Sequence, residues 1–303
     1  MEAKPILVVG SAALDTLETP MGNEEDALGG SSFYFSTAAS LLAPVRLVAV
    51  IGNDFPMEKI AFLKDRNVDL DGLIVEDGAT FRWGGRYHED PNKRDTLFTE
   101  LGVFEHFDPK IPEHFKNTPL IFLGNIQPAL QLKVLDQIEN PELVVLDTMN
   151  LWIDITPDDL EKAIRRVDVL ILNDEEALQL TGKFSLLDAA DDLFSRGLQK
   201  IIVKKGQHGA VLFEKEGGIF FVPAYPLRKV KDATGAGDTF AAGMMGYLAN
   251  HDLNDFESWR QAIVYGTITA SFVCEEFSMR KTCDLTPEKL EERIAEFRKM
   301  TQF

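Results

Sequence analysis

The chain has 303 residues, of which 45% are hydrophobic and 26% charged, a composition typical of soluble globular proteins. It carries 49 acidic and 31 basic residues, a formal net charge of −18. Without a dense basic cluster, so negative a chain is not expected to bind nucleic acid or an anionic membrane surface. If it handles anionic nucleotides, it must neutralise them locally, with a metal ion or with backbone dipoles.

The sequence shows no disulfide framework and no targeting segment. Cys274 and Cys283 are its two cysteines, too few for a four-thiolate zinc site, and free thiols suit a reducing cytosol. The N-terminal stretch MEAKPILVVG lacks the basic start and long apolar run of a signal peptide. No run approaches the length of a membrane span. We therefore expect a cytoplasmic protein.

Five short apolar runs predict strands, at residues 5–15, 45–54, 120–125, 143–150 and 167–174. Their apolar stretches are continuous, as in parallel strands that are covered on both faces. Each run ends in Asp or Asn: Asp15, Asn53 with Asp54, Asn125, Asn150, and Asn173 with Asp174. One such residue is commonly a turn former, but five favour a ligand crevice at the carboxyl ends of the strands.

Helical patterns separate these runs. One begins after Ser31, and another begins at Pro287, which suits the first turn of a helix. The alternation of strand and helix predicts an α/β fold, doubly wound, with a mostly parallel sheet sandwiched by helices.

The segment 80–104 breaks this alternation, because it is rich in aromatic and β-prone residues around the turn EDPNK. It predicts a hairpin that projects from the α/β body. Residues 15–20, after the first run, could add strands to it. We expect a single domain over residues 1–303, with a small β lid formed by about 15–28 and 80–104. The lid could pair with that of a second chain and so form a homodimer.

The segment DATGAGDTF, residues 232–240, places two glycines and a carboxylate before an apolar helix pattern. Gly235 and Gly237 allow the backbone to turn tightly and to approach a ligand. Apolar residues follow at a spacing of four: Phe240, Met244 and Leu248. The amides at the start of such a helix form an anion site, with Asp238 beside it. An isolated Asp here would as often merely stabilise the helix, and no Lys-Ser/Thr follows as in a P-loop.

The wider segment DATGAGDTFAAG resembles the C-terminal signature of the ribokinase-like, or PfkB-type, carbohydrate kinases. The resemblance covers essentially the whole chain, because Gly29–Gly30 after Asp15, IGND at 51–54 and LNDEEALQLTG at 172–182 fall in the family's order. It implies a ribokinase-like fold and transfer of the γ-phosphate of ATP to a hydroxyl of a sugar or sugar-containing small molecule.

The resemblance also implies roles on the phosphoryl side. Asp238 would be the catalytic base that accepts the proton of the acceptor hydroxyl. The anion hole would consist of the backbone amides of three residues: Gly235, Ala236 and Gly237. Two pairs match metal positions: Asn173 and Glu176 for Mg²⁺ and phosphate, and Asp232 and Thr234 for the monovalent cation, K⁺, of some members. The nucleotide would contact Lys204, Gly206, Gly209 and Thr267.

On the acceptor side the matching positions are Asp15, Gly29, Gly30 and Asp54, and Tyr34 is a further candidate at a position where the chain departs from ribokinase. Ribokinase has Asn where this chain has Ala13 and Tyr34, so free ribose is not the expected acceptor. Tyr34 could stack on a ring or could equally pack inward. Aromatic and basic lid residues could cover a planar base or bind an anionic acceptor: Arg82, Trp83, Arg86 and Tyr87. Strand alternation could instead direct half of them to solvent or to a partner lid.

Three functions remain open at this stage. A carbohydrate kinase leads, a nucleoside kinase of the same family follows closely, and a non-catalytic relative that binds a sugar or nucleotide is disfavoured by the intact Gly-x-Gly-Asp.

Overall fold

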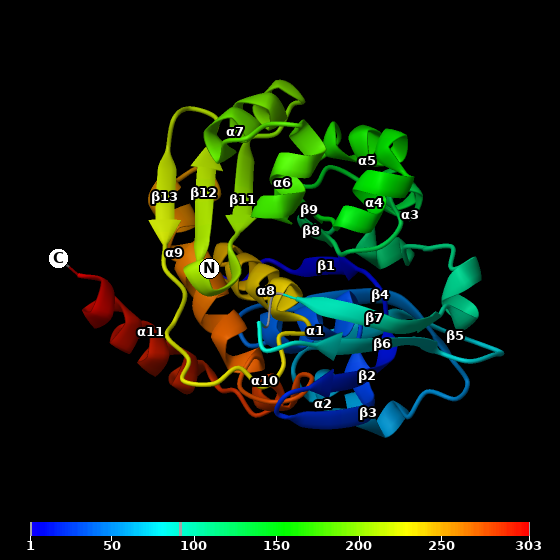
Figure 1. Ribbon diagram of the computed structural model, residues 1–303. Coiled ribbons are helices and arrows are strands. Elements are labelled where there is room, and N and C mark those ends of the chain that lie inside the picture. Colours follow the sequence, from blue (N-terminus) through cyan, green and yellow to red (C-terminus); the bar gives the residue numbers. More distant parts are fainter. Residues whose placement is uncertain (1, 91–92, 303) are drawn as a thin grey trace.

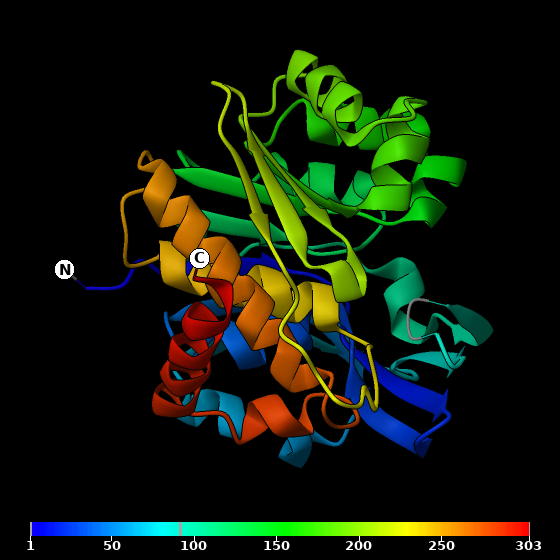
Figure 2. The same ribbon diagram turned by 60° about the vertical axis from the view of Figure 1, so that its left-hand side comes forward.

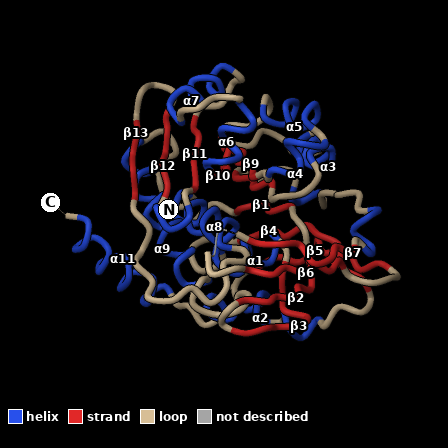
Figure 3. Tube along the Cα trace, in the orientation of Figure 1, coloured by secondary structure: helices blue, strands red, loops and turns tan. Residues whose placement is uncertain are grey.

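The computed structural model describes residues 2–90 and 93–302 and contains two sheets of very different size (Figures 1 and 3). In the described residues the large sheet has nine strands in the order β13-β12-β11-β10-β9-β8-β1-β4-β5. The strands from β11 to β5 in this order run parallel, and β12 and β13 are antiparallel at one edge. The predicted doubly wound, mostly parallel sheet is confirmed.

The strands of the large sheet are short and mostly buried, as continuous apolar runs predict. Their bounds are β1 Ile6–Val9, β4 Val45–Gly52, β5 Val68–Glu76, β8 Leu120–Leu123, β9 Leu143–Asp147, β10 Val169–Asn173, β11 Lys200–Lys204, β12 Ala210–Glu214 and β13 Ile219–Val222. All five predicted runs contribute a strand to this sheet.

Helices cover both faces of the large sheet, each over its own apolar core (Figures 1 and 2). One face carries α1 Ser31–Ala39, α2 Phe62–Asp65, α8 Ala236–Leu248, α9 Phe256–Val273, α10 Arg280–Cys283 and α11 Pro287–Thr301. The other carries α3 Pro128–Leu135, α4 Asn150–Ile155, α5 Pro157–Ile164, α6 Asp174–Thr181 and α7 Leu186–Ser195. The helices predicted after Ser31 and at Pro287 are α1 and α11.

The small sheet projects from the body at lower right in Figure 2. Its strands are β2 Ala13–Thr19, β3 Gly22–Gly29, β6 Phe81–Tyr87 and β7 Arg94–Glu100, in the order β3-β2-β6-β7. The segments 15–28 and 80–104 fall on it, although the centre of the predicted turn EDPNK lies outside the described residues. We call these four strands the lid; a covering function for them is still a prediction.

One detail of the strand prediction is wrong. The run 5–15 does not form one strand, because β1 ends at Val9 and the chain enters lid strand β2 at Ala13. Asp15 therefore lies on a lid strand and not at the carboxyl end of a core strand. Continuous apolarity hid this break, because both strands have buried residues.

Candidate active site

The first turn of α8 supplies backbone amides to the site. Gly235 caps this helix with a left-handed φ of 72°, a conformation that favours glycine. A Cβ at this position would lie 2.2 Å from the ring of Tyr34, so the packing of α1 against α8 also requires glycine here. The N–H groups that follow, at Ala236 and Gly237, belong to a turn whose dipole favours an anion. The anion hole stays a prediction with a suitable geometry.

Asp238 lies in this first turn, and its Oδ1 is buried without a hydrogen-bond partner in the described residues. Burial raises the pKa of Asp238 to about 7, the Asp147 carboxylate adds to the rise, and Lys204 and Arg94 oppose it. A carboxyl with such a pKa can accept a proton near neutral pH. An unpartnered buried oxygen also calls for a ligand atom.

Lys204 and Asp147 meet beside the same turn, at the ends of β11 and β9. The Lys204 ammonium donates a hydrogen bond of 2.9 Å to Asp147 Oδ1. A Cβ on Gly237 would lie 2.9 Å from the same ammonium nitrogen. Sequence reasoning assigned Lys204 to the nucleotide but missed Asp147, although its position at the end of an apolar run was a usable signal.

Asn173 and Glu176 open α6 as a capping box. Asn173 Oδ1 accepts a hydrogen bond from the Glu176 amide at 2.7 Å, and Glu176 Oε2 accepts one from the Asn173 amide at 2.8 Å. The Asn-x-x-Glu spacing thus has a local structural role of its own. The other carboxylate oxygen of Glu176, Oε1, takes no part in this capping box. Burial raises the pKa of Glu176, and the positive charge of Lys204 opposes that rise.

Asp232 and Thr234 connect three parts of the chain. The Asp232 carboxylate accepts hydrogen bonds from the amides of Thr234 at 2.8 Å and Ser278 at 2.9 Å. The Thr234 hydroxyl donates to the Tyr87 hydroxyl of the lid at 2.9 Å. These contacts join the loop before α8 to the loop after α9 and to β6. A monovalent cation at Asp232 and Thr234 stays a prediction.

On the acceptor side, Gly29 leaves room for the Asp15 carboxylate, and Gly30 leaves room for the backbone at Ser11. A Cβ on Gly29 would lie 2.0 Å from a carboxylate oxygen of Asp15. Gly30 has a φ of 90°, and a Cβ there would lie 2.5 Å from the Ser11 carbonyl oxygen. Burial, followed by repulsion from Asp232, raises the pKa of Asp15 to about 8, against the opposing charge of Arg94. At neutral pH this carboxyl is mostly protonated and can donate as well as accept.

Tyr34 packs inward, which was one of the two alternatives for it. Its side chain is 2% exposed, and one face of the ring lies against Gly235. The hydroxyl is buried without a hydrogen-bond partner in residues 2–90 and 93–302. Burial, followed by the charges of Asp232 and Asp15, raises the pKa of Tyr34. Tyr34 therefore offers the acceptor region a hydroxyl rather than a platform for stacking.

Asp54 is fully engaged at the base of the lid. Its Oδ1 accepts hydrogen bonds from the Thr80 amide at 2.7 Å and hydroxyl at 2.6 Å, and its Oδ2 pairs with Arg82 at 3.2 Å. Burial opposes these hydrogen bonds, yet together they hold the pKa of Asp54 below its ordinary value. A contact between Asp54 and the acceptor stays untested, and its visible role is to fix the start of β6.

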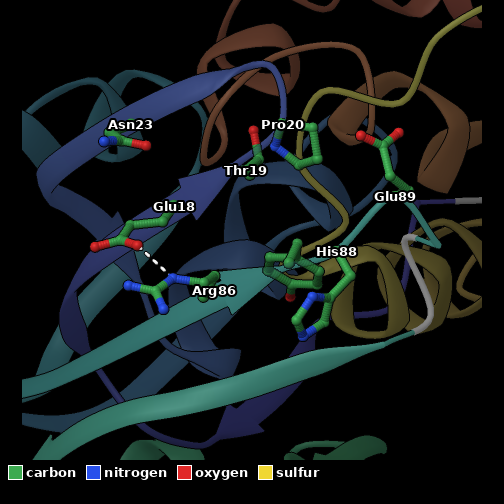
Figure 4. Close-up of a pocket in the computed structure, with 8 residues that line it drawn as sticks. Glu18, Thr19, Pro20, Asn23, Arg86, His88 and Glu89 are labelled. Carbon is green, nitrogen blue, oxygen red and sulfur yellow. Dashed lines mark hydrogen bonds and ion pairs between the residues drawn. The ribbon is translucent and has the colours of Figure 1, made fainter.

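Arg86 is exposed near the end of β6. It pairs with Glu18 at 2.6 Å and lines a pocket of about 400 Å³ between the end of β6 and the β2–β3 turn (Figure 4). Arg82 pairs with Asp26 as well as Asp54. Both predicted lid arginines thus have carboxylate partners within the lid or at its base.

Trp83 lies flat on the inner face of the lid. It pairs in register with Asp15, and a Cβ on Gly85 would lie 2.1 Å from its indole ring. Gly85 therefore lets the indole lie along the sheet. Phe98 does the same over Gly84 on the opposite face, since the two residues pair in register.

Arg94 is the lid residue that sequence reasoning missed. Its guanidinium carbon lies 5.4 Å from the centroid of the Trp83 ring. Its charge acts on Asp15 and Asp238, and it hydrogen-bonds Tyr87. No sequence signal singles it out from other lid arginines, because the contact depends on the β6–β7 register.

The predicted nucleotide residues lie in two places. Gly206 and Gly209 form the turn between β11 and β12, where a Cβ on Gly209 would lie 1.9 Å from the Val222 carbonyl oxygen. Thr267 is buried within α9, and its hydroxyl donates to the Ile263 carbonyl at 2.9 Å. Contacts of these residues with ATP stay predictions.

Comparisons with known proteins identify the family and agree with the fold. The model of the pfkB family of carbohydrate kinases matches residues 34–285. A cytidine kinase of Thermococcus kodakarensis is 29% identical over 265 residues, which are 82% of this chain and 91% of that protein. The crystal structure of the nucleoside kinase of Methanocaldococcus jannaschii, described as an archaeal member of the ribokinase family, has a TM-score of 0.78 and 24% identity, over 97% of this chain and 99% of that one.

A third comparison concerns the fold with nucleotide bound. An E. coli protein assigned as a ribokinase II, in complex with ATP and Mg²⁺, has a TM-score of 0.81 and 17% identity, covering 97% of this chain and 99% of that one.

Among the helices of the described residues, none combines the length and apolarity that crossing a membrane requires.

Proposed function

The chain belongs to the pfkB family of carbohydrate kinases, and from this premise we propose that it transfers the γ-phosphate of ATP to a hydroxyl of a nucleoside. The observation that carries the choice of acceptor is the Trp83 indole, laid flat over Gly85 in register with Asp15. A flat aromatic surface beside a sugar-binding carboxyl suits a molecule made of a sugar and a planar base.

The relatives support this choice. The proteins from T. kodakarensis and M. jannaschii are named cytidine kinase and nucleoside kinase. The sequence agrees, because Ala13 and Tyr34 stand where ribokinase has Asn, and Tyr34 is buried against Gly235. Cytidine is therefore the first acceptor to test.

The residues at the α8 turn fit a nucleotide with Mg²⁺. Asp147, Asn173 and Glu176 offer oxygen atoms, which Mg²⁺ prefers as ligands. Asp147 accepts a hydrogen bond from the Lys204 ammonium, and the charge of Glu176 acts on the same group. Glu176 and Asn173 would hold the metal, directly or through water. Bound there, Mg²⁺ would neutralise phosphate charge that this acidic chain cannot offset by itself.

The proposed reaction follows from the position of Asp238. Its carboxylate takes the proton of the acceptor hydroxyl while the hydroxyl oxygen forms a bond to the γ-phosphorus. The bond from that phosphorus to the bridging oxygen breaks, and its electron pair leaves with ADP. The amides of Gly235, Ala236 and Gly237 stabilise the charge on the transferred group.

The experiment compares Trp83→Leu with Phe98→Leu, which removes the matching ring from the opposite face of the lid. Base stacking contributes roughly 1–3 kcal/mol, so we expect Trp83→Leu to raise KM for cytidine about tenfold or more. Phe98→Leu should leave KM within about twofold. Equal effects of the two substitutions would remove the case for a base on Trp83.

A further inference from the structure

Lys204 stands at the point where the predicted base and anion hole meet. It ends β11 in register with Asn173 of β10, and its side chain is 20% exposed. Its ammonium nitrogen lies 2.9 Å from Asp147 Oδ1 and 2.9 Å from the place a Cβ on Gly237 would take. Gly237 immediately precedes Asp238, so this cation faces the reacting end of a nucleotide rather than its base.

Neighbouring carboxylates keep the Lys204 ammonium charged and fix its position. Burial alone would lower the pKa of Lys204, but Asp147 and then Glu176 raise it above its ordinary value, so the group stays charged. Asp147 is 8% exposed at its side chain. A charged pair this far from solvent keeps a fixed geometry, because either partner alone would be a buried, unpaired charge.

We propose that Lys204 is a catalytic residue that binds the γ-phosphate on the α8 turn, and that Asp147 is the positioning residue that holds its ammonium there. The inference rests on the proposed function, since it requires ATP at this site. It adds a side-chain cation to the backbone amides and the Mg²⁺ that would carry the phosphoryl charge.

The adjacent lysine is a natural control. Lys205 follows Lys204 directly and pairs with Asp174 at 3.2 Å, with a side chain 30% exposed. Lys205 lies just beyond the end of β11, and its ammonium pairs with a different carboxylate from the one that Lys204 contacts. The same substitution at 205 therefore removes an equal charge from the same strand end without touching the turn at Gly237.

The test measures binding of ADP and of the non-hydrolysable analogue AMP-PNP by calorimetry, with Mg²⁺ and without acceptor. A charge-assisted hydrogen bond to the γ-phosphate predicts that Lys204→Met weakens AMP-PNP binding about 10- to 100-fold. Binding of ADP, which has no γ-phosphate, should change less than about threefold. Lys205→Met should leave both affinities near wild type.

Because Lys204→Met leaves Asp147 unpaired, the double variant Lys204→Met/Asp147→Asn repeats the measurement without a buried net charge. It should show the same selective loss of AMP-PNP. Equal weakening of both nucleotides, or of neither, would overturn the γ-phosphate assignment even if the wild type is an active kinase. A wild type that binds no AMP-PNP would contradict the proposed function as well.

For Asp147, the readout is kcat against AMP-PNP affinity in Asp147→Asn. Loss of positioning predicts that kcat falls about tenfold or more and that AMP-PNP binding weakens more than ADP binding. An unchanged kcat would show that Asp147 does not position Lys204.

Discussion

At the scale of single residues, the proposed reaction depends most directly on Asp238 as the base. Its carboxylate occupies the first turn of α8 with one oxygen buried and unpartnered in the described part of the chain. Asp238→Asn keeps the shape of the side chain and removes its basicity. We expect kcat to fall by roughly 10²–10⁴, with ATP binding nearly unchanged. Steady-state kinetics and calorimetry on the same preparation measure both.

The pH dependence is the control for this prediction. The base must be ionised, and burial with the Asp147 charge raises the pKa of Asp238 to about 7. As the pH falls through that value, Asp238 takes up a proton and kcat should fall; above it, kcat should level off. The acidic limb should be absent from the residual activity of Asp238→Asn. Wild-type-like turnover by that variant would rule out Asp238 as the base.

At the scale of elements, hydrogen bonds, ion pairs and apolar packing connect the lid to the body. Tyr87 reaches Thr234, Arg82 pairs with Asp54, and Trp83 packs against Phe277. Strand β3 adds contacts with Lys59, Ser278 and Arg280. Replacing residues 80–104 by a short Gly/Ser turn would remove Val103 and Phe104 from one core of the large sheet and leave the other residues of its two cores in place.

We expect that replacement to leave a folded body with little transfer activity, because closure over the acceptor excludes water. The measurement is phosphorylated acceptor formed per ADP released, with thermal unfolding as the control for folding. Full transfer by the shortened protein would show that the segment is not a functional lid.

Pairing of two lids is a separate prediction at this scale. The outer strand β7 exposes Leu97 and Phe98 at 38% and 36%, and exposed apolar edge strands tend to acquire partners. Sedimentation should detect a dimer that Phe98→Glu weakens. A monomer would end the pairing claim and leave the lid claim intact.

At the scale of the whole molecule, local patterns predicted most of the fold. Continuous apolar runs marked β4, β8, β9 and β10 because burial on both faces is written into each strand separately. The glycine segment correctly predicted that Asp238 lies at the start of a helix, because the signals that begin a helix are also local in the sequence. The break at Val9, which moves Asp15 into the lid, was hidden because both sides of it are apolar.

Contacts between residues far apart in the sequence could not be predicted from the sequence. Lys204 and Asp147 are 57 positions apart and meet because β9, β10 and β11 are neighbours in the sheet. Arg94 meets Trp83 through the register of two lid strands. Such charge partners depend on the order of strands in the sheet, which cannot be predicted from the spacing of residues along the chain.

The central claim, a nucleoside as acceptor, is tested most directly by ADP release from saturating MgATP with cytidine, other nucleosides, free ribose and fructose. The account predicts the highest kcat/KM for a nucleoside. It also predicts a ribose value lower by roughly a hundredfold or more, since two hydroxyl partners are lost at about 1–3 kcal/mol each. Ribose or fructose as the best acceptor would contradict it.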